Sequence, residues 1–426
     1  MMEKIAIALF IATYLLLLVL PKFRAHIALL GAGLFVVAGI VPLSLVGTLV
    51  DWNVILMIAG TMGIVSLFIA SRMPALLADL IIERTPNIRW AVVALALFAG
   101  IISAFVDNVA TVLMVAPVAI SVANKQGVSP VTSVIAVAIS SNLQGAATLV
   151  GDATSILLGG HAHLDFLDFF FVHGRPGLFW IVQAGAVVAT TVLFWVLRSS
   201  TQSVQPQGRT QVEDYFPTLL LASMVVLLIL ASFVPHKPAI TNGLICVFLL
   251  IVGLLREVLS GGGFKVVRDT VANIDLFTLL LLVGLFVVVG GLTQVGVIDR
   301  FSVLVVKLGQ GNIFLIYTLV VWLSVLVSGF VDNIPYVATM LPVVGGVANL
   351  LGVDANLFYF GLLVGATLGG NITPIGASAN ITALGLLRKE GYEVGAGEFM
   401  RLSVPFTLAA VCTGYVLLWL VWGGAV

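Results

Sequence analysis

A short segment containing Asp107 and Asn108 occurs twice in this chain. Residues 103–118 read SAFVDNVATVLMVAPV, and residues 328–343 read SGFVDNIPYVATMLPV. The two segments are identical at 8 of 16 positions without a gap, and one constant shift in numbering, from 103 to 328, relates them. Only about one or two identities are expected by chance between apolar segments, so the match indicates a duplicated unit. Each copy places a carboxylate and a carboxamide inside an apolar run.

The composition requires lipid as the solvent of this chain. Its 426 residues are 61% hydrophobic and 9% charged, with a mean hydropathy of +1.20, whereas a soluble domain is about 25% charged. We therefore predict an all-α polytopic membrane protein. The net charge is zero, which gives no electrostatic support to a nucleic-acid partner. The lipid bilayer is the partner that the composition implies.

Apolar runs long enough to cross a bilayer are separated by one clear polar linker, residues 198–215. The linker divides the chain into two predicted transmembrane repeats, 1–197 and 216–426. Simple spans are expected at 5–20, 26–49, 53–70, 177–197, 216–234, 240–255, 275–292 and 402–422. The more polar stretch 71–89 is expected to lie at the membrane interface, and the stretch 294–311 holds the same place in the second half.

The two Asp-Asn pairs fall near the middle of apolar blocks of unusual length. Block 90–123 has 34 residues, which is too many for one span of about 20 and too few for two. This length predicts a re-entrant hairpin that turns inside the membrane with Asp107 and Asn108 at its tip. Block 312–351 is predicted to do the same around Asp332 and Asn333. By length alone, two full spans joined by an Asp-Asn turn on the far face remain an alternative.

The distribution of basic residues predicts that the two repeats are inverted. If the N-terminus lies outside, 14 of the 19 Lys and Arg fall on the inner side, including Arg24 and the linker arginines. The linker is then cytoplasmic. The first hairpin enters from the inside and the second from the outside, an arrangement typical of secondary transporters whose site lies near the membrane midplane.

A second motif, Gly-x-x-Thr-x-x-Gly, also recurs, and the same shift in numbering relates its copies. It spans 145–151 in block 131–160 and 370–376 in block 356–387. Glycines and Pro374 weaken a helix, so both blocks are predicted to be broken helices. A break at membrane depth exposes backbone carbonyls that suit Na⁺ and half-helix ends that suit anionic oxygens. Close helix packing through small residues is the alternative explanation for the glycines.

These motifs resemble those of the ion transporter superfamily. The resemblance rests on FVDNVAT at 105–111, ATLVGD at 147–152 and LGGNITPIGASAN at 368–380, and it covers roughly residues 50–170 and 275–420. It is closest to the branch of ArsB-type arsenite permeases, NhaD-type sodium/proton antiporters, the melanosomal P protein and plant silicon efflux transporters. The divalent anion/sodium symporters are more distant relatives. The resemblance implies two inverted repeats, each with a re-entrant hairpin and an unwound helix, in a homodimer that works by an elevator movement. It also implies a bacterial inner membrane and, for a true arsenite permease, a soluble ATPase partner.

The hairpin tips depart from those of the symporter relatives. The resemblance places Ser103, Ser328, Asn108 and Asn333 at positions that match the serines and asparagines of those tips. Asp107 and Asp332, however, stand where the symporters have Ser. Val109 and Ile334 stand where they have the Thr that touches a substrate carboxylate, which argues against dicarboxylate transport.

Three acids, Asp107, Asp152 and Asp332, lie in apolar blocks that contain no Lys or Arg to pair with them. An acid at mid-membrane costs about 2.5–3.5 kcal/mol on the insertion scale, so it binds a proton or holds a cation. We therefore expect Na⁺ or H⁺ as the coupling ion and no other cofactor. The predicted Na⁺ ligands are Ser103, Asp107, Asn108, Ser328, Asp332 and Asn333. The remaining predicted substrate- or ion-binding residues are Thr111, Asn142, Gly145, Thr148, Gly151, Asp152, Asn371, Thr373, Gly376, Ser378 and Asn380.

The predicted function is secondary active transport of a small anion or its neutral acid, with an arsenite-type oxyanion favoured. A Na⁺/H⁺ antiporter and a di- or tricarboxylate/Na⁺ symporter are the alternatives within this class. An intramembrane aspartyl protease needs two carboxylates that share a proton, but its Gly-x-Gly-Asp motif is missing around Asp152 and it would not explain the duplicated Asp332. A passive channel would conduct without coupling. No enzymatic activity is predicted.

Overall fold

The computed structural model describes residues 2–203 and 208–424, so residues 204–207 of the predicted linker lie outside the described residues. Within these ranges the regular secondary structure is helical apart from one short antiparallel strand pair, β1 (Phe171–Val172) and β2 (Arg175–Pro176). In the same ranges, eight helices are long and apolar enough to cross a membrane, or nine if the bent pair formed by α15 and α16 is one span. The predicted all-α polytopic membrane fold is confirmed.

The described part of the first half contains α-helices and short 3-10 turns. Their bounds are α1 (Met2–Val19), η1 (Pro21–Phe23), α2 (Arg24–Val37), η2 (Leu43–Leu45), α3 (Val46–Leu49), α4 (Trp52–Ala70), α5 (Met73–Ile82), α6 (Ile88–Ser103), α7 (Asn108–Lys125), α8 (Val131–Gly145), α9 (Ala153–Ala162), η3 (Phe166–Phe169) and α10 (Leu178–Val196).

The second half repeats this order. Its elements are α11 (Phe216–Ser232), α12 (Thr241–Glu257), the π-helical turn η4 (Val258–Gly262), α13 (Gly263–Asn273), α14 (Leu276–Gln294), α15 (Val297–Leu308), α16 (Ile313–Ser328), α17 (Asn333–Leu351), α18 (Asn356–Leu363), the π-helical turn η5 (Val364–Leu368), α19 (Ser378–Lys389) and α20 (Ala396–Trp422).

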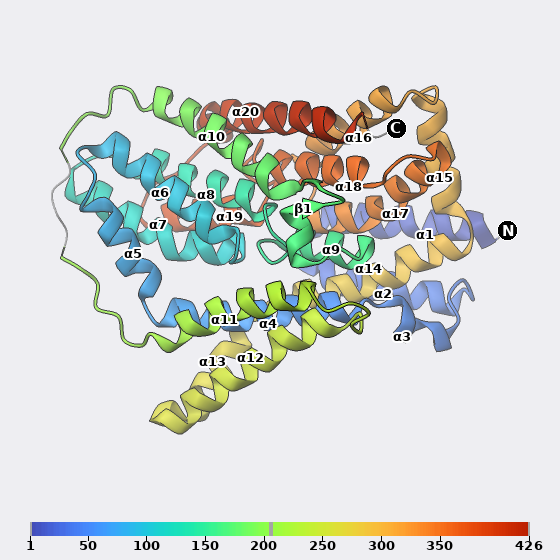
Figure 1. Ribbon diagram of the computed structural model, residues 1–426, viewed down its shortest axis with the longest axis horizontal. Helices are drawn as coiled ribbons and strands as arrows, with labels where there is room; N and C mark the ends of the chain where they lie inside the picture. Colours follow the sequence, from blue (N-terminus) through green and yellow to red (C-terminus); the bar gives the residue numbers. More distant parts are fainter. Residues whose placement is uncertain (1, 204–207, 425–426) are drawn as a thin grey trace.

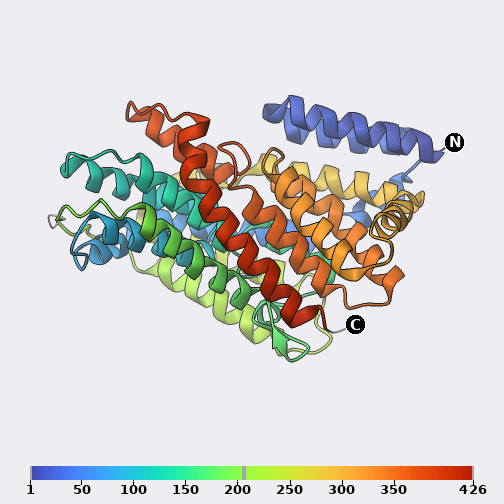
Figure 2. The same ribbon diagram turned by 90° about the horizontal axis from the view of Figure 1, so that it is seen from above.

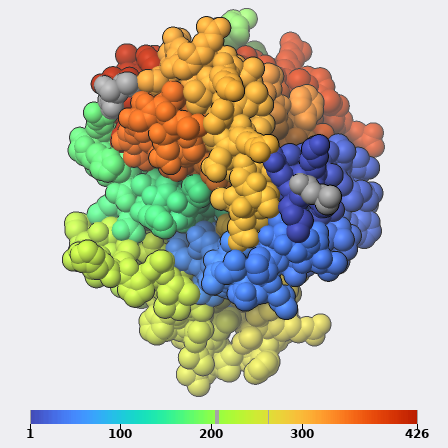
Figure 3. All heavy atoms as spheres, turned by 90° about the vertical axis from the view of Figure 1, so that its right-hand side faces the viewer, coloured from blue at the N-terminus to red at the C-terminus, as the bar shows by residue number. Residues whose placement is uncertain are grey.

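The helices that carry the two motifs lie between outer helices. In Figure 1, α4, α11 and α12 run along one side of the molecule and α10 and α20 along the other, with α7 to α9 and α17 to α19 between them. Contacts join α4 to α12, α11 to α12 and α10 to α20. Figure 3 shows α12 and α13, in yellow-green and yellow, projecting at the lower edge. The motif-bearing segments therefore lie between two sets of outer helices (Figure 1), although Phe330 and Ile375 of the second half are exposed.

The predicted span 26–49 is wrong in its second part. Helix α2 ends at Val37, and residues 38–49 form a turn, η2 and the short α3. Gly39 has a φ of +71°, the left-handed conformation with which helices commonly end, and Pro42 follows shortly after it. Apolar residues continue through this stretch, so hydropathy alone does not predict where the helix ends.

Corresponding helices of the two halves begin at matching places in the sequence. Helices α6, α7, α8 and α9 begin at 88, 108, 131 and 153, and α16, α17, α18 and α19 begin at 313, 333, 356 and 378, so the shift of the motifs is kept in all four pairs. Asp51 caps α4 through the backbone N–H of Val54, and Asp275 caps α14 through that of Thr278. The repetition seen in the motifs thus extends to the secondary structure.

The last helix of each half indicates how the halves are oriented. Figure 2 shows α10, in green, beside α20, in red. The indole N–H of Trp422, near the end of α20, lies 3.3 Å from the carbonyl oxygen of Pro176, just before α10, while Gly185 faces Ala410. Helices α10 and α20 are therefore antiparallel, which is the relation that an inverted repeat requires of equivalent helices.

Each half also contributes a glycine to a close helix crossing with the other half. Gly60 of α4 faces the backbone of Cys246 in α12, and Gly284 of α14 faces the backbone of Ala28 in α2. These two crossings are equivalent, because Gly60 and Gly284 each occupy the ninth position of their helix. Small residues allow helix backbones to approach in a membrane, where van der Waals packing replaces the hydrophobic effect.

We predict that Gly284→Ala destabilises the protein while Gly33→Ala does not. A Cβ at Gly284 would lie within 2.8 Å of three atoms of Ala28, so α2 and α14 would have to separate, at a cost of about 1–3 kcal/mol. At Gly33, also within a helix, a Cβ meets nothing within 4 Å, and alanine favours the helix. The measurement is the midpoint of thermal unfolding in detergent, and equal midpoints for the two variants would contradict the packing argument.

Candidate functional site

Each Asp-Asn pair forms the turn of a helical hairpin, with the aspartate as the N-cap of the second helix. Asp107 Oδ1 accepts hydrogen bonds from the backbone N–H groups of Val109 and Ala110 at 3.0 and 3.1 Å. Asp332 Oδ1 accepts one such bond, from Ile334 at 3.0 Å, because the next residue is Pro335, which has no N–H. The cap satisfies donors that the helix leaves free, and the helix dipole stabilises the carboxylate.

Each hairpin turn has a buried asparagine. Asn108 and Asn333, the residues after the two caps, are each only 6% exposed. Asn108 Nδ2 donates to Asn142 Oδ1 of α8 at 2.9 Å. This burial shields the two asparagines from bulk water, and α7 and α17 are each long enough to cross a membrane.

The Gly-x-x-Thr-x-x-Gly motif holds each hairpin turn against the broken helix of its own half. The hydroxyl of Thr148 donates to the carbonyl oxygen of Ala104, and that of Thr373 donates to the carbonyl oxygen of Gly329. A Cβ at Gly151 would collide with the carbonyl oxygens of residues 103, 104 and 145. At Gly376 it would collide with those of residues 328, 329 and 370. The second glycine of the motif is therefore required by the close approach of three carbonyl groups.

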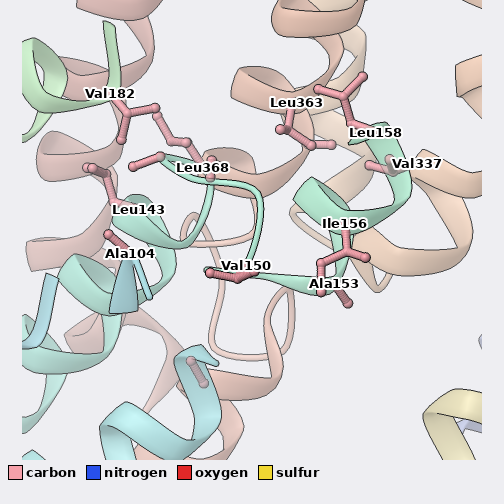
Figure 4. Close-up of a cluster of buried hydrophobic side chains, with 14 of the residues drawn as sticks. Ala104, Leu143, Val150, Ala153, Ile156, Leu158, Val182, Val337, Leu363 and Leu368 are labelled. Atoms are coloured by element: carbon pink, nitrogen blue, oxygen red, sulfur yellow. The ribbon is translucent and has the colours of Figure 1, made fainter. Parts of the chain in front are cut away.

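Both broken helices rest on apolar side chains from the two halves. Figure 4 shows Leu143 and Leu158, from α8 and α9, in the same buried cluster as Leu363 and Leu368, from α18 and η5. Helix α8 ends at Gly145 and α9 begins at Ala153, while η5 ends at Leu368 and α19 begins at Ser378. The breaks fall where the glycine pattern predicts them, and the packing around them fixes the unwound backbone.

A hydrogen-bonded network of asparagines joins the two halves. Asn142 Nδ2 donates to the carbonyl oxygen of Thr367 at 2.8 Å and lies 3.1 Å from Asn371 Oδ1. Asn371 Nδ2 donates to the carbonyl oxygen of Ile139 at 2.8 Å. The shift in numbering that relates the motifs also relates Asn142 to Thr367, so the contact links equivalent positions where the halves meet.

A cavity of about 490 Å³ brings the two hairpin turns and both broken helices together. Five of the predicted binding residues line it: Asp107, Asn108, Asp152, Asn333 and Ser378. The other predicted residues are not among its lining residues and form the surrounding frame: Ser103, Thr111, Asn142, Gly145, Thr148, Gly151, Ser328, Asp332, Asn371, Thr373, Gly376 and Asn380. Several residues of this frame donate hydrogen bonds to backbone carbonyl oxygens. Ser328 Oγ donates to that of Ala366 at 2.5 Å, and Asn380 Nδ2 donates to that of Gly370 at 3.2 Å.

Further polar residues, which the motifs did not reveal, also line the cavity. Asp269 and Asn273 come from α13, a helix that the apolar pattern did not predict, and Asp275 caps α14. The sequence signal for Asp275 is its correspondence with Asp51 as a helix cap. With Asp107 and Asp152, four carboxylates of the described chain thus face the cavity, against one guanidinium, that of Arg24.

The expectation that all three intramembrane acids lack a basic partner is wrong for Asp332. Arg24 Nη1 lies 2.5 Å from Asp332 Oδ2, and both side chains are about a quarter exposed. Arg24 stands at the start of α2, so a search of the apolar block around Asp332 does not find it. Among the described residues, no Lys or Arg forms an ion pair with Asp107 or Asp152, and Asp152 Oδ2 accepts its bond from the Thr154 hydroxyl at 2.8 Å.

A family model described as a citrate transporter, CitMHS, matches residues 14–365. The chain belongs to this transporter family. It is 33% identical over 433 residues to an uncharacterized transporter of Mycobacterium tuberculosis, covering 98% of this chain and 99% of that protein. It is 26% identical over 498 residues to the human P protein, covering 96% of this chain and 59% of the P protein. The resemblance to the ion transporter superfamily is confirmed, and the protein is a membrane transporter and not an enzyme.

Solved structures of two membrane transporters share the fold. The YdaH transporter of Alcanivorax borkumensis matches with a TM-score of 0.59 at 19% identity, over 86% of this chain and 84% of that one. MtrF of Neisseria gonorrhoeae, described as one of a class of antimetabolite efflux pumps, matches with a TM-score of 0.54 at 14% identity, over 86% and 80%. At these identities the likeness concerns the fold alone.

We predict that Asn142→Ala destabilises the protein by about 1–3 kcal/mol. The change leaves the buried amide of Asn108 and the carbonyl oxygen of Thr367 without their partner, and the cost of such groups is their desolvation. Asn349→Ala, at an exposed position of α17, is the matched control. Thermal unfolding of both variants in detergent checks the prediction, and a midpoint for Asn142→Ala as high as that of the control would disprove the role of the network.

Proposed function

We propose that this protein is a secondary active transporter that uses Na⁺ or H⁺ to move a small anion, or its neutral acid, through the cavity between the two hairpin turns. The observation that carries the proposal is the composition of that cavity. It is lined by the turn residues Asp107 and Asn333 and by Asp152 and Ser378 of the broken helices, so both hairpins and both broken helices contribute. Such a meeting of unwound segments is typical of the substrate sites of secondary transporters.

The excess of carboxylates supports cation coupling. A carboxylate in an apolar environment is stable only when it is protonated or holds a cation, and Asp107 and Asp152 have no ion-pair partner among the described residues. An anion entering alone would meet four carboxylates and be repelled by them. An anion accompanied by Na⁺ or H⁺, or the neutral acid, avoids this repulsion.

The cargo is proposed to be an arsenite-type oxyanion or its neutral acid. Val109 and Ile334 both line the cavity, at the positions where carboxylate symporters present the Thr hydroxyl to their substrate. The name of the family model supports the alternative of a di- or tricarboxylate symporter. The acidic lining supports the other alternative, a Na⁺/H⁺ antiporter.

We further propose that the halves, 1–197 and 216–426, are inverted repeats that move as an elevator within a homodimer. The antiparallel pairing of α10 with α20 supports the inversion. The contacts of α7 with α19 and of α9 with α17 support a single moving unit built from both halves. A bacterial inner membrane, a cytoplasmic linker and, for arsenite export, a soluble ATPase partner complete the proposal.

We predict that Asp107→Asn and Asp152→Asn each reduce coupled flux about tenfold or more without unfolding the protein. Each amide keeps the shape of the side chain but cannot be protonated or pair with a cation, and a charge-assisted contact of about 1.5–3 kcal/mol is lost. Flux into proteoliposomes is followed with a pH dye while Na⁺, citrate, arsenite and silicate are added singly and in pairs. Asp299→Asn, at an exposed position of α15, is the matched control.

The same assay separates the candidates. Proton release on addition of Na⁺ alone identifies an antiporter, whereas a requirement for citrate or for arsenite together with a cation identifies that cargo. Wild-type flux in both cavity variants would rule out the acid-centred mechanism. Flux that follows only the concentration gradient, with no coupling, would show a channel.

A further inference from the structure

We propose that Arg24 is the anion-binding residue of the cavity and that Asp332 neutralises it until an anion takes its place. The proposal rests on the proposed function and names the step that links anion to cation. Among the described residues, Arg24 supplies the one guanidinium that lines the cavity, where Asp107, Asp152, Asp269 and Asp275 supply the carboxylates. It is therefore the group that attracts an anion there.

Most of the guanidinium remains available to a ligand. In the described part of the chain, Arg24 donates to Asp332 through Nη1 alone, at 2.5 Å. A guanidinium carries five N–H donors in a planar fork that matches a carboxylate or an oxyanion. Because Arg24 lines the cavity and is partly exposed there, an anion can approach the unused donors before the contact with Asp332 is broken.

The carboxylate of Asp332 has fewer backbone hydrogen-bond donors than that of Asp107, so it relies on Arg24 for stabilisation. The carboxylate of Asp107 receives two backbone N–H bonds, whereas that of Asp332 receives one, because Pro335 stands where the first hairpin has Ala110. The ion pair with Arg24 compensates Asp332 for the missing donor. Removing Arg24 from it would leave a poorly satisfied carboxylate, which is costly in a partly buried site.

The arginine is present in one half only. The crossing of α2 with α14 is equivalent to that of α12 with α4, and Ala28 in the first corresponds to Cys246 in the second. Four residues before Ala28 stands Arg24, and four residues before Cys246 stands Asn242. The first hairpin therefore has no equivalent guanidinium at this position, and Asp107 stays free for a cation while Asp332 is paired.

The exchange of partners gives coupling by charge balance. Before binding, Arg24 and Asp332 neutralise each other. When an anion pairs with Arg24, two groups are left near Asp332. One is the hydroxyl of Tyr14, which contacts Pro335 and Thr339 about one helical turn further along α17, and the other is the carboxylate of Asp152. Neither neighbour supplies a positive charge, so Asp332 takes up H⁺ or Na⁺. The anion and the cation thus favour each other's binding, and this linkage is reciprocal.

The test is binding of citrate, sulfate and phosphate to the purified protein by isothermal titration calorimetry. Each anion is titrated with Na⁺ and with a bulky organic cation as the only cation, at a mildly acidic and a mildly basic pH. We expect the wild type to bind at least one of them, with an affinity that rises with Na⁺ or with acidity. Arg24→Gln should weaken that binding about 10- to 100-fold, because a charge-assisted, bidentate contact is lost. Arg24→Lys should restore part of it through charge alone.

Asp332→Asn gives the distinguishing result. It removes the competitor for Arg24, so the anion should bind more tightly than to the wild type. The dependence on Na⁺ and pH should weaken, because only the part contributed by Asp107 and Asp152 remains. The double variant Arg24→Gln/Asp332→Asn removes both members of the ion pair, so no unpaired charge remains to destabilise the fold. It should bind the anion weakly and with the same reduced cation dependence as Asp332→Asn. Arg209→Gln, which removes an exposed ion pair with Glu83, is the matched control and should behave as the wild type does.

Two results would overturn the inference alone: wild-type anion affinity in Arg24→Gln, or unchanged cation dependence in Asp332→Asn. A wild-type protein that binds none of the three anions in any condition would overturn the inference, while coupled flux in the proteoliposome assay would still decide the proposed function. The failure of the inference and the failure of the proposed function can therefore be told apart.

Discussion

The close approach of each hairpin turn to an unwound helix segment is the constraint on which the rest of the structure depends. Gly151 and Gly376 lie where three carbonyl oxygens converge, so no side chain fits there, and the neighbouring threonines bond to the carbonyls of the turns. Unpaired carbonyls are costly in an apolar interior. The threonine hydroxyls and the helix caps satisfy polar groups that a break would otherwise expose, and this lets polar turns exist deep within the protein.

The cavity follows from this constraint. Once the turns are held against the broken helices, their polar ends converge on one space between the halves. The carboxylates that line it are kept apart by the helices that they cap: Asp107 belongs to α7 and Asp275 to α14. An acidic cavity with a single guanidinium among its described lining residues is suited to accept a positive ion, or an anion only together with one. This charge distribution is what connects the fold to the proposed coupled transport.

Much of the site could be predicted from the sequence because its signals are local. The Asp-Asn turns, the glycines of the breaks and the constant shift between the copies are visible in short stretches, and the helices begin and end near them. The ion pair of Arg24 with Asp332 could not be predicted, because 308 residues separate its members and no motif marks the arginine. Asp269 could not be predicted because α13 is short and polar. The end of α2 could not be predicted because the turn at Gly39 lies within a run of apolar residues. Contacts that depend on where helices distant in the sequence cross cannot be predicted from any single short segment.

The contact between Asn142 and Thr367 sets a limit on how alike the halves can be. Two copies of one large polar side chain at these positions would compete for the same space, since each residue meets its own counterpart there. One half therefore supplies the amide and the other supplies only its main chain. The two positions therefore hold different residues, Asn142 and Thr367, that are complementary in one contact.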